Sequence, residues 1–175
     1  VLSHHSWPAS MRRVDALISP NPLQPSKRTA MQVLRRTLVA AVAAVAFGAS
    51  FAAAAQDIAS SASRTRAELG PITILVNNAG ITGFCRFEEI TEEMMDRMMD
   101  INIKGPFLCT QAIIPDMVAA HWGRIVNISS SSAQTGAPMM AHYATSKGGV
   151  IAFTKTLARE YAEKGITVNN IPPGF

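Results

Sequence analysis

The chain has 175 residues, of which 48% are hydrophobic and 16% charged, which fits one domain and excludes a chain dominated by a disordered, highly charged tail. Its formal net charge is +4, but residues 1–56 carry six basic side chains and one acidic one, so the excess positive charge lies outside residues 57–175. A nucleic-acid-binding domain needs its basic side chains on the folded surface, so this distribution argues against nucleic acid as a partner.

Cysteine and histidine positions give no sign of a metal centre. Cys85 and Cys109 stand alone rather than in a C-x-x-C pair, which excludes a disulfide framework and a cysteine-rich zinc site. Reduced thiols are typical of a cytoplasmic protein. His4 and His5 have no further ligand at helical spacing, and we expect no metal site.

The first 56 residues differ in composition from the rest. Residues 1–30 contain four prolines and no sustained periodicity, which indicates a flexible segment. Residues 31–56 carry a basic pair followed by an alanine-rich apolar run over 38–55. This order is typical of a secretory signal peptide, and an alanine-rich hydrophobic helix fits it as well. We expect a cytoplasmic protein, exported only if residues 31–56 act as a signal peptide and membrane-bound only if residues 38–55 are retained.

From residue 57 onward, helical and strand patterns alternate. The β-branched runs at 72–76, 125–128 and 166–169 predict short buried strands. Helices are predicted over 57–69, from Thr91 to about His121 with an interruption at Gly105-Pro106, and over 141–163. This alternation is typical of parallel βαβ units, so we expect an α/β fold.

Polar motifs follow the predicted strands. The sequence Asn-Asn-Ala-Gly at 77–80 comes directly after the first strand, and four serines at 129–132 follow the second. In open α/β sheets, ligands bind at the carboxyl ends of the strands, so these motifs predict a site there. Tyr143 and Lys147, four residues apart, share one face of the last predicted helix.

Three further motifs complete a pattern. Asn102 lies in Asn-Ile-Lys-Gly, Ser130 precedes Tyr143 by thirteen residues, and a Pro-Gly pair at 173–174 follows the third strand. In order and spacing, the motifs resemble the short-chain dehydrogenase/reductase family, in particular its 3-oxoacyl-carrier-protein-reductase-like members. The resemblance covers residues 57–175 and implies a three-layer αβα, Rossmann-like parallel sheet. It also implies an oxidoreductase that uses NAD or NADP to interconvert a carbonyl and a hydroxyl group of a small molecule, in a homo-oligomer.

The resemblance assigns catalytic roles to Asn102, Ser130, Tyr143 and Lys147. Tyr143 would be the acid/base group, because the ammonium of Lys147 one turn along the helix favours the ionised phenol. Ser130 would hydrogen-bond the substrate oxygen, and Asn102 would hold a water in a proton relay behind Lys147. The cofactor-binding residues that the resemblance implies are Asn77, Asn78, Ala79, Gly80, Tyr143, Lys147, Pro173 and Gly174.

Simpler structural roles stay open for some of these positions. Asn77 and Asn78 could equally tie neighbouring strands together. The serines beside Ser130 fit turn positions. His121 and His142 are expected on exposed helix surface.

Complete members of the family also carry a glycine-rich turn near their start and a substrate region toward their end. The only glycine before Gly70 is Gly48, so this turn is absent from those residues and we expect cofactor binding to be weak. The three strands resemble strands 4, 5 and 6 of the family, so the sheet should be incomplete. Its edge should be unpaired, because the alanine-rich residues 31–55 favour helix. The alternative is a truncated, non-catalytic fragment that self-associates through its long helices.

Overall fold

The computed structural model describes residues 37–38 and 51–174. Its strands form one parallel sheet in the order β1-β2-β3-β4. They span Thr37–Leu38 (β1), Ile74–Asn77 (β2), Gly123–Ile128 (β3) and Ile166–Ile171 (β4). The three strands predicted from the sequence are thus confirmed, with bounds shifted by a few residues. Because the register pairs Asn77 with Asn127 and Asn127 with Asn170, the strand ends and the loops after them meet at one edge.

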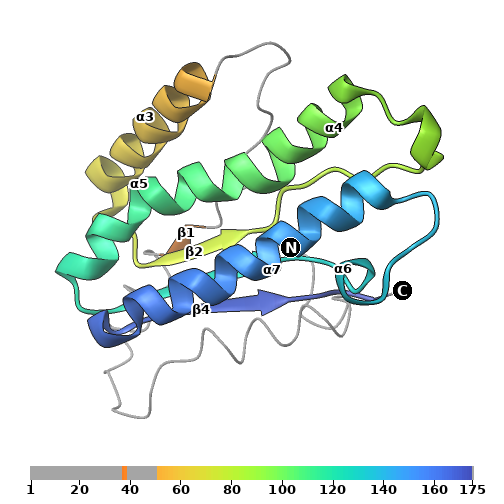
Figure 1. Ribbon diagram of the computed structural model, residues 1–175. Coiled ribbons are helices and arrows are strands. Elements are labelled where there is room, and N and C mark those ends of the chain that lie inside the picture. The colour runs from red at the N-terminus through yellow and green to blue at the C-terminus, as the bar shows by residue number, and fades with distance from the viewer. Residues whose placement is uncertain (1–36, 39–50, 175) are drawn as a thin grey trace, which may run out of the picture.

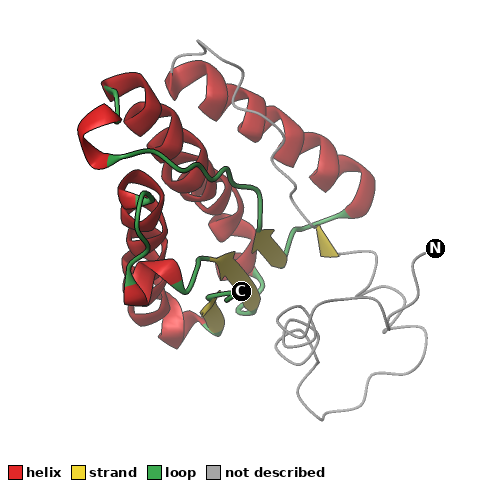
Figure 2. Cartoon of the chain, turned by 90° about the vertical axis from the view of Figure 1, so that its right-hand side faces the viewer, coloured by secondary structure: helices red, strands yellow, loops and turns green. Residues whose placement is uncertain are grey.

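The long helices lie on one face of the sheet (Figure 1, Figure 2). They are α3 (Phe51–Leu69), α5 (Gly105–Ala119) and α7 (Ala141–Tyr161), and shorter helices are α4 (Glu92–Met99) and α6 (Ser132–Thr135). This is the helix cover expected of consecutive right-handed βαβ units. The α/β class is confirmed, whereas a helical layer on the other face is not among the described residues.

The main hydrophobic core fills the space between the sheet and these three helices. It combines residues from every layer of the packing, namely Ala62, Ile72, Leu75, Cys109, Ile113, Met117, Ile125, Ile166 and Val168. Alternate strand residues such as Val126 and Ile171 form a smaller cluster on the opposite face. The core therefore fixes the strands against the helices and leaves the sheet edge free to carry polar groups.

Helix α3 begins at Phe51, earlier than the predicted start at residue 57. Residues 51–56 belong to the alanine-rich run, and alanine has the highest helix propensity, so the helix extends through them. Residues 39–50 of that run, like residues 1–30, lie outside the described residues. The flexible segment and the signal peptide therefore stay predictions.

The expectation of an unpaired edge at β2 is wrong in part. Thr37 and Leu38 form a short parallel strand that pairs with Ile74 and Leu75. Such pairing uses backbone N–H and C=O groups, which any residue other than proline offers, so a helix-favouring composition does not prevent it. Only the first half of β2 is paired in this way.

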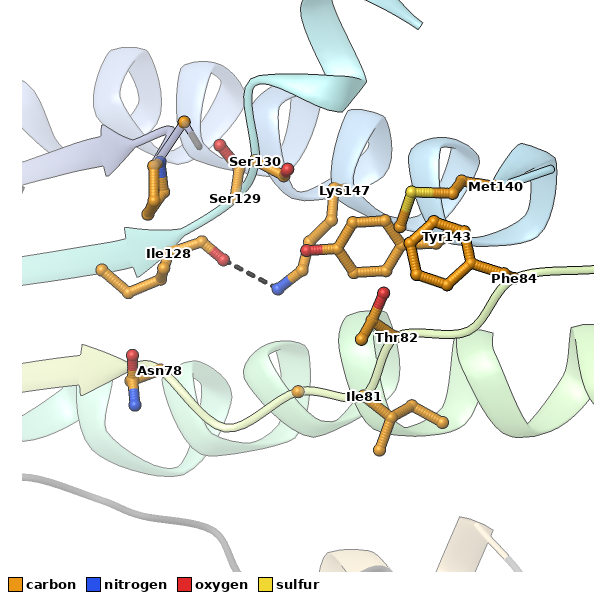
Figure 3. Close-up of a pocket in the computed structure, with 13 residues that line it drawn as sticks. Asn78, Ile81, Thr82, Phe84, Ile128, Ser129, Ser130, Met140, Tyr143 and Lys147 are labelled. Carbon is orange, nitrogen blue, oxygen red and sulfur yellow. Dashed lines mark hydrogen bonds between the residues drawn. The ribbon is translucent and has the colours of Figure 1, made fainter. Parts of the chain in front are cut away.

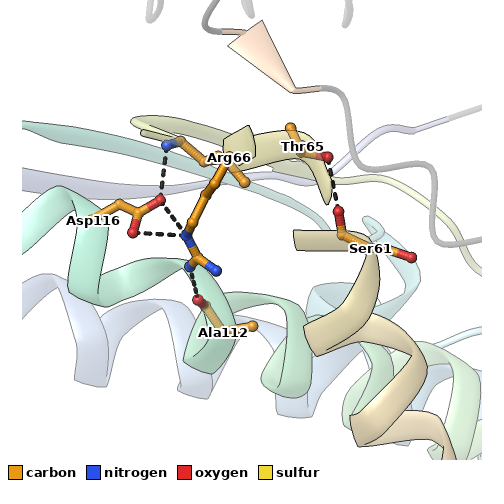
Figure 4. Close-up of polar contacts among 6 residues, drawn as sticks. Ser61, Thr65, Arg66, Ala112 and Asp116 are labelled. Carbon is orange, nitrogen blue, oxygen red and sulfur yellow. Dashed lines mark hydrogen bonds and ion pairs between the residues drawn. The ribbon is translucent and has the colours of Figure 1, made fainter. Parts of the chain in front are cut away.

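A half-buried ion pair joins α3 to α5 (Figure 4). Arg66 Nε donates to the two carboxylate oxygens of Asp116 at 2.9 and 2.8 Å, and its guanidinium also donates to the carbonyl of Ala112. The backbone N–H of Ile72 donates to Asp116 Oδ2 at 2.9 Å. One carboxylate thus connects two helices with the residue that leads into β2.

Cys109 lies in the core and is 2% exposed. Burial raises the pKa of its thiol to about 11, because the thiolate would lose its hydration. Since the thiolate is the reactive form, we expect a maleimide at about pH 8 to label the half-buried Cys85 alone in the folded protein and both thiols in urea. Equal labelling rates of both cysteines in the folded protein would contradict this burial.

Candidate active site

Strand β2 ends in Asn77, whose side chain is buried and used inside the protein. Its Nδ2 donates to Asn127 Oδ1 at 2.8 Å and to Thr110 Oγ1 at 3.2 Å. Asn127 in turn donates from Nδ2 to Thr154 Oγ1 at 2.9 Å. Because buried amides need partners, these contacts tie β2, β3, α5 and α7 together, which is the strand-tying role left open for Asn77.

Asn102 lies in a π-helical turn, Asp100–Lys104, that joins α4 to α5. It is 1% exposed, and its carboxamide holds both backbone groups of Ile81. Ile81 N donates to Asn102 Oδ1 at 2.9 Å, and Asn102 Nδ2 donates to the Ile81 carbonyl at 2.9 Å. Pro106 has no N–H, so the carbonyl of Asn102 lacks its α-helical donor four residues on. The interruption predicted at Gly105-Pro106 is therefore real, and it begins one turn earlier.

Ser130 follows β3 and is 8% exposed. Its Oγ lies 2.8 Å from Ser132 Oγ, and the backbone N–H of Ser132 donates to the same oxygen at 3.3 Å. When Ser132 is the donor in both contacts, the hydroxyl proton of Ser130 is left for another acceptor. The sequence suggested only a turn role for Ser132, because this contact depends on how the chain folds back into α6.

Helix α7 presents Tyr143 and Lys147 to the same side, one turn apart (Figure 3). Lys147 is 5% exposed, and its Nζ donates to the carbonyl of Ile128 at 2.9 Å and lies 5.9 Å from the centre of the Tyr143 ring. Burial lowers the pKa of Lys147, because the ammonium loses hydration. Within the described part of the chain, no carboxylate forms an ion pair with it.

Gly80 faces Lys147 across a narrow space. A Cβ on Gly80 would lie 3.0 Å from Asn102 Oδ1 and 3.1 Å from Lys147 Nζ, closer than such contacts normally are. The missing side chain therefore lets the loop after β2 approach both the ammonium and the Asn102 carboxamide.

These groups border a cavity of about 350 Å³ at the carboxyl ends of the strands (Figure 3). Its lining includes seven residues singled out from the sequence, namely Asn78, Gly80, Ser130, Tyr143, Lys147, Pro173 and Gly174. Three others, Asn77, Ala79 and Asn102, do not line it. Asn102 instead hydrogen-bonds the backbone of Ile81, which does line the cavity. The apolar side of the cavity is formed by Ile81, Phe84 and Met140. No sequence pattern predicts it, because these residues come together only in the folded chain.

Lys147 offers a stability test of this arrangement. Its folded-state pKa lies below the unfolded one, so the charged side chain destabilises the fold at low and neutral pH, and this cost fades as the pH rises through the folded-state pKa. Lys147→Met should therefore raise the Tm at neutral pH, and its advantage over the parent should shrink in alkaline buffer. Thermal melts across the pH range measure this, and a parent that is more stable at neutral pH would contradict it.

His142 differs from the expectation of an exposed helix residue. It is 3% exposed, because the first turn of α7 packs against the loop after β2, where a Cβ on Gly83 would lie 3.4 Å from His142 Nε2. His121 is exposed as expected, but it lies in the turn after α5 with a φ of +48° rather than in a helix.

The described residues contain neither a cluster of metal ligands nor a membrane-spanning helix. In residues 37–38 and 51–174, no group of three or more His, Cys, Asp or Glu side chains could hold a metal ion. No helix in this same portion is long and apolar enough to cross a membrane. Most of the run over 38–55 lies outside that portion, so the cytoplasmic location and the alternative of export stay predictions.

Known proteins are similar to this chain in sequence and in fold. One similar protein is the 3-oxoacyl-acyl-carrier-protein reductase FabG of Staphylococcus epidermidis, which is 44% identical over 108 residues. The matched region covers 62% of this chain and 44% of that protein. Another is the acetoacetyl-CoA reductase of Shinella zoogloeoides, which is 45% identical over 112 residues. Here the matched region covers 64% of this chain and 46% of that protein. The chain thus spans less than half the length of these relatives.

The fold and the sequence profile point to the same family. A crystal structure of a gluconate 5-dehydrogenase from Burkholderia cenocepacia, in complex with NADP and tartrate, superimposes with a TM-score of 0.67 and 32% identity over 70% of this chain and 49% of that one. The profile of the short chain dehydrogenases matches residues 23–175, which extends well upstream of the domain start predicted at residue 57. The chain therefore belongs to the short-chain dehydrogenase family.

Proposed function

We propose that the chain carries the catalytic half of an NAD(P)-dependent oxidoreductase that interconverts a carbonyl and a hydroxyl group, with Tyr143 as acid/base group. The observation that supports this most is that Tyr143, Lys147 and Ser130 line one pocket at the carboxyl ends of the strands. An enzyme of this kind needs a proton donor, a cation and a hydrogen-bond donor around one substrate oxygen. The pocket offers all three.

The residues of the pocket fit the nicotinamide and ribose end of such a cofactor. Lys147 presents an ammonium that can donate to ribose hydroxyls, and Gly80 leaves the space beside it free of a side chain. Ser129 lines the same pocket with a buried hydroxyl that has no hydrogen-bond partner among the described residues. When bound, the cofactor would supply a hydride to the carbonyl carbon or take one from the alcohol carbon.

The side chains would handle the proton. As the carbonyl is reduced, its oxygen gains negative charge, and the Ser130 hydroxyl donates a hydrogen bond to it. Tyr143 gives its phenolic proton to that oxygen, and the Lys147 ammonium stabilises the phenolate that remains. The proton is then restored from solvent, and the carbonyl of Asn102, without an α-helical donor, can hold a water on that path. Alcohol oxidation runs the same steps in reverse.

The named substrates of the relatives suggest the first assays. Those proteins are reductases of 3-oxoacyl-carrier protein and of acetoacetyl-CoA, so we propose a small carbonyl or alcohol compound as substrate. We expect the purified chain to oxidise NADPH or NADH when acetoacetyl-CoA or another ketone is added, with reduced nicotinamide followed by its absorbance. Absence of turnover on a ketone panel by a chain that melts cooperatively would contradict the proposal.

We also propose that the chain forms a homo-oligomer through α5 and α7. Phe107 on α5 is 44% exposed, and its ring centre lies 5.8 Å from that of Phe153 on α7. A second copy would remove this aromatic pair from water, which favours association. Light scattering should give at least the mass of a dimer, with Phe107→Ser shifted toward monomer, and a strictly monomeric parent would contradict the proposal.

A further inference from the structure

Ser146 lies between Tyr143 and Lys147 on α7 and is completely buried, with 0% exposure. Its hydroxyl donates to the carbonyl of Tyr143 at 2.7 Å and accepts from Asn102 Nδ2 at 2.9 Å. The first contact lies within its own helix. The second crosses from α7 to the π-helical turn, so it connects two separate walls of the proposed active site.

The carboxamide of Asn102 carries this connection further. Its Oδ1 accepts from Ile81 N, and its Nδ2 donates to the Ile81 carbonyl, each at 2.9 Å. Ile81 and the preceding Gly80 line the pocket opposite Lys147. A chain of hydrogen bonds therefore runs from α7 through Ser146 and Asn102 to the loop that faces the ammonium.

Ser146 is the second strong acceptor for the Asn102 carboxamide, beside the carbonyl of Ile81. Nδ2 has two protons, and its acceptors are the Ile81 carbonyl, Ser146 Oγ and Met98 Sδ, the last at 3.1 Å. A thioether sulfur is a weak acceptor, so without Ser146 the second proton has no strong acceptor among these groups. A buried donor left unsatisfied costs free energy, which the carboxamide can reduce by turning away from Ile81.

We infer that Ser146 is a positioning residue, which orients Asn102 so that the loop at Gly80 and Ile81 is held at a fixed distance from Lys147. This inference rests on the proposed function for its effect on cofactor binding. The hydrogen bonds themselves do not depend on that function, and the amide proton of Ile81 reports on them directly.

Thr154, two turns further along α7, provides a matched control. Its Oγ1 donates to the carbonyl of Val150 at 2.7 Å and accepts from Asn127 Nδ2 at 2.9 Å. It is also buried, at 4% exposure. Ser146 and Thr154 thus each donate to a carbonyl of their own helix and accept from a buried asparagine amide, but only the asparagine that contacts Ser146 hydrogen-bonds Ile81.

Amide hydrogen exchange of the full chain, followed by NMR, tests the inference with Ser146→Ala and Thr154→Val. We expect Ser146→Ala to speed exchange of the Ile81 amide by about ten-fold relative to the amides of β4, the scale of one unsatisfied buried donor. Thr154→Val should leave the Ile81 ratio unchanged. Ser146→Thr, which keeps the hydroxyl, should restore part of the protection.

The outcomes separate this inference from the proposed function. An unchanged Ile81 ratio in Ser146→Ala, or an equal change in Thr154→Val, would overturn the inference whether or not the chain binds a cofactor. If the Ile81 ratio changes and NADPH binds the parent, Ser146→Ala should weaken that binding by a similar factor, and unchanged binding would overturn the positioning role. If the parent binds no nicotinamide cofactor, the proposed function fails, while the Ile81 exchange still decides the contact.

Discussion

Tyr143→Phe is expected to lower kcat for carbonyl reduction by at least about 100-fold, the usual contribution of a general acid. The substitution removes the phenolic hydroxyl and keeps the ring that lies 5.9 Å from Lys147 Nζ. Without that proton, the developing alkoxide can be neutralised only by solvent. Steady-state kinetics with a ketone and reduced nicotinamide cofactor measure the effect, and binding of the cofactor should persist.

Tyr161→Phe provides the control, since the chain has two tyrosines. Tyr161 is the last residue of the same helix, at the end away from the pocket, and its side chain packs against the core. Loss of its hydroxyl should leave kcat within about two-fold, because Tyr161 does not line the pocket and so cannot give a proton to the substrate. Comparable losses in both variants, or full activity of Tyr143→Phe, would rule out the acid/base role.

Gly165→Ala is expected to lower the free energy of unfolding by about 3 kcal/mol or more, as a positive φ and a backbone clash combine. Gly165 ends the short 3-10 turn after α7 with a φ of +73°, a left-handed conformation that costs other residues. A Cβ there would lie 2.2 Å from the carbonyl oxygen of His121. Because that oxygen belongs to the backbone of the turn before β3, relief requires the turn to move.

Gly70→Ala separates the two causes. Gly70 also has a positive φ, +85°, but nothing lies within 4 Å of its added Cβ. It should therefore cost only about 1–2 kcal/mol, the conformational part alone. Urea unfolding of both variants measures the difference. Equal decreases in the free energy of unfolding would show that the close contact between the two turns does not contribute to the effect of Gly165→Ala.

The parts of the site that depend on local spacing could be predicted from the sequence. Tyr143 and Lys147 share a helix face because they are four residues apart, and residues after parallel strands meet at one edge by topology. The predicted strands and helices are confirmed for the same reason. Hydrophobic periodicity and the stop signal at Gly70 are local properties of the chain.

The rest depends on contacts between distant segments. Ser146 and Asn102 are 44 residues apart, and nothing in the neighbourhood of either indicates that they meet. Burial of His142 likewise follows from packing of the loop near Gly83 on α7. The pairing of Thr37 with Ile74 uses backbone groups, which are the same in almost every residue and so leave no signal in the sequence. Sequence patterns do not predict these three features, because in each a tertiary contact outweighs the local preference.

The most direct test of the account is isothermal titration calorimetry of NADPH and NADH with the parent chain, Lys147→Met and Tyr161→Phe. The account predicts saturable binding of at least one nucleotide by the parent and by Tyr161→Phe. Lys147→Met should bind at least about ten-fold more weakly, because a charged hydrogen bond is lost. Since the same substitution is expected to stabilise the fold, this loss cannot be ascribed to unfolding. No saturable binding by a folded parent, or equal affinities of the parent and Lys147→Met, would contradict a cofactor site at this pocket.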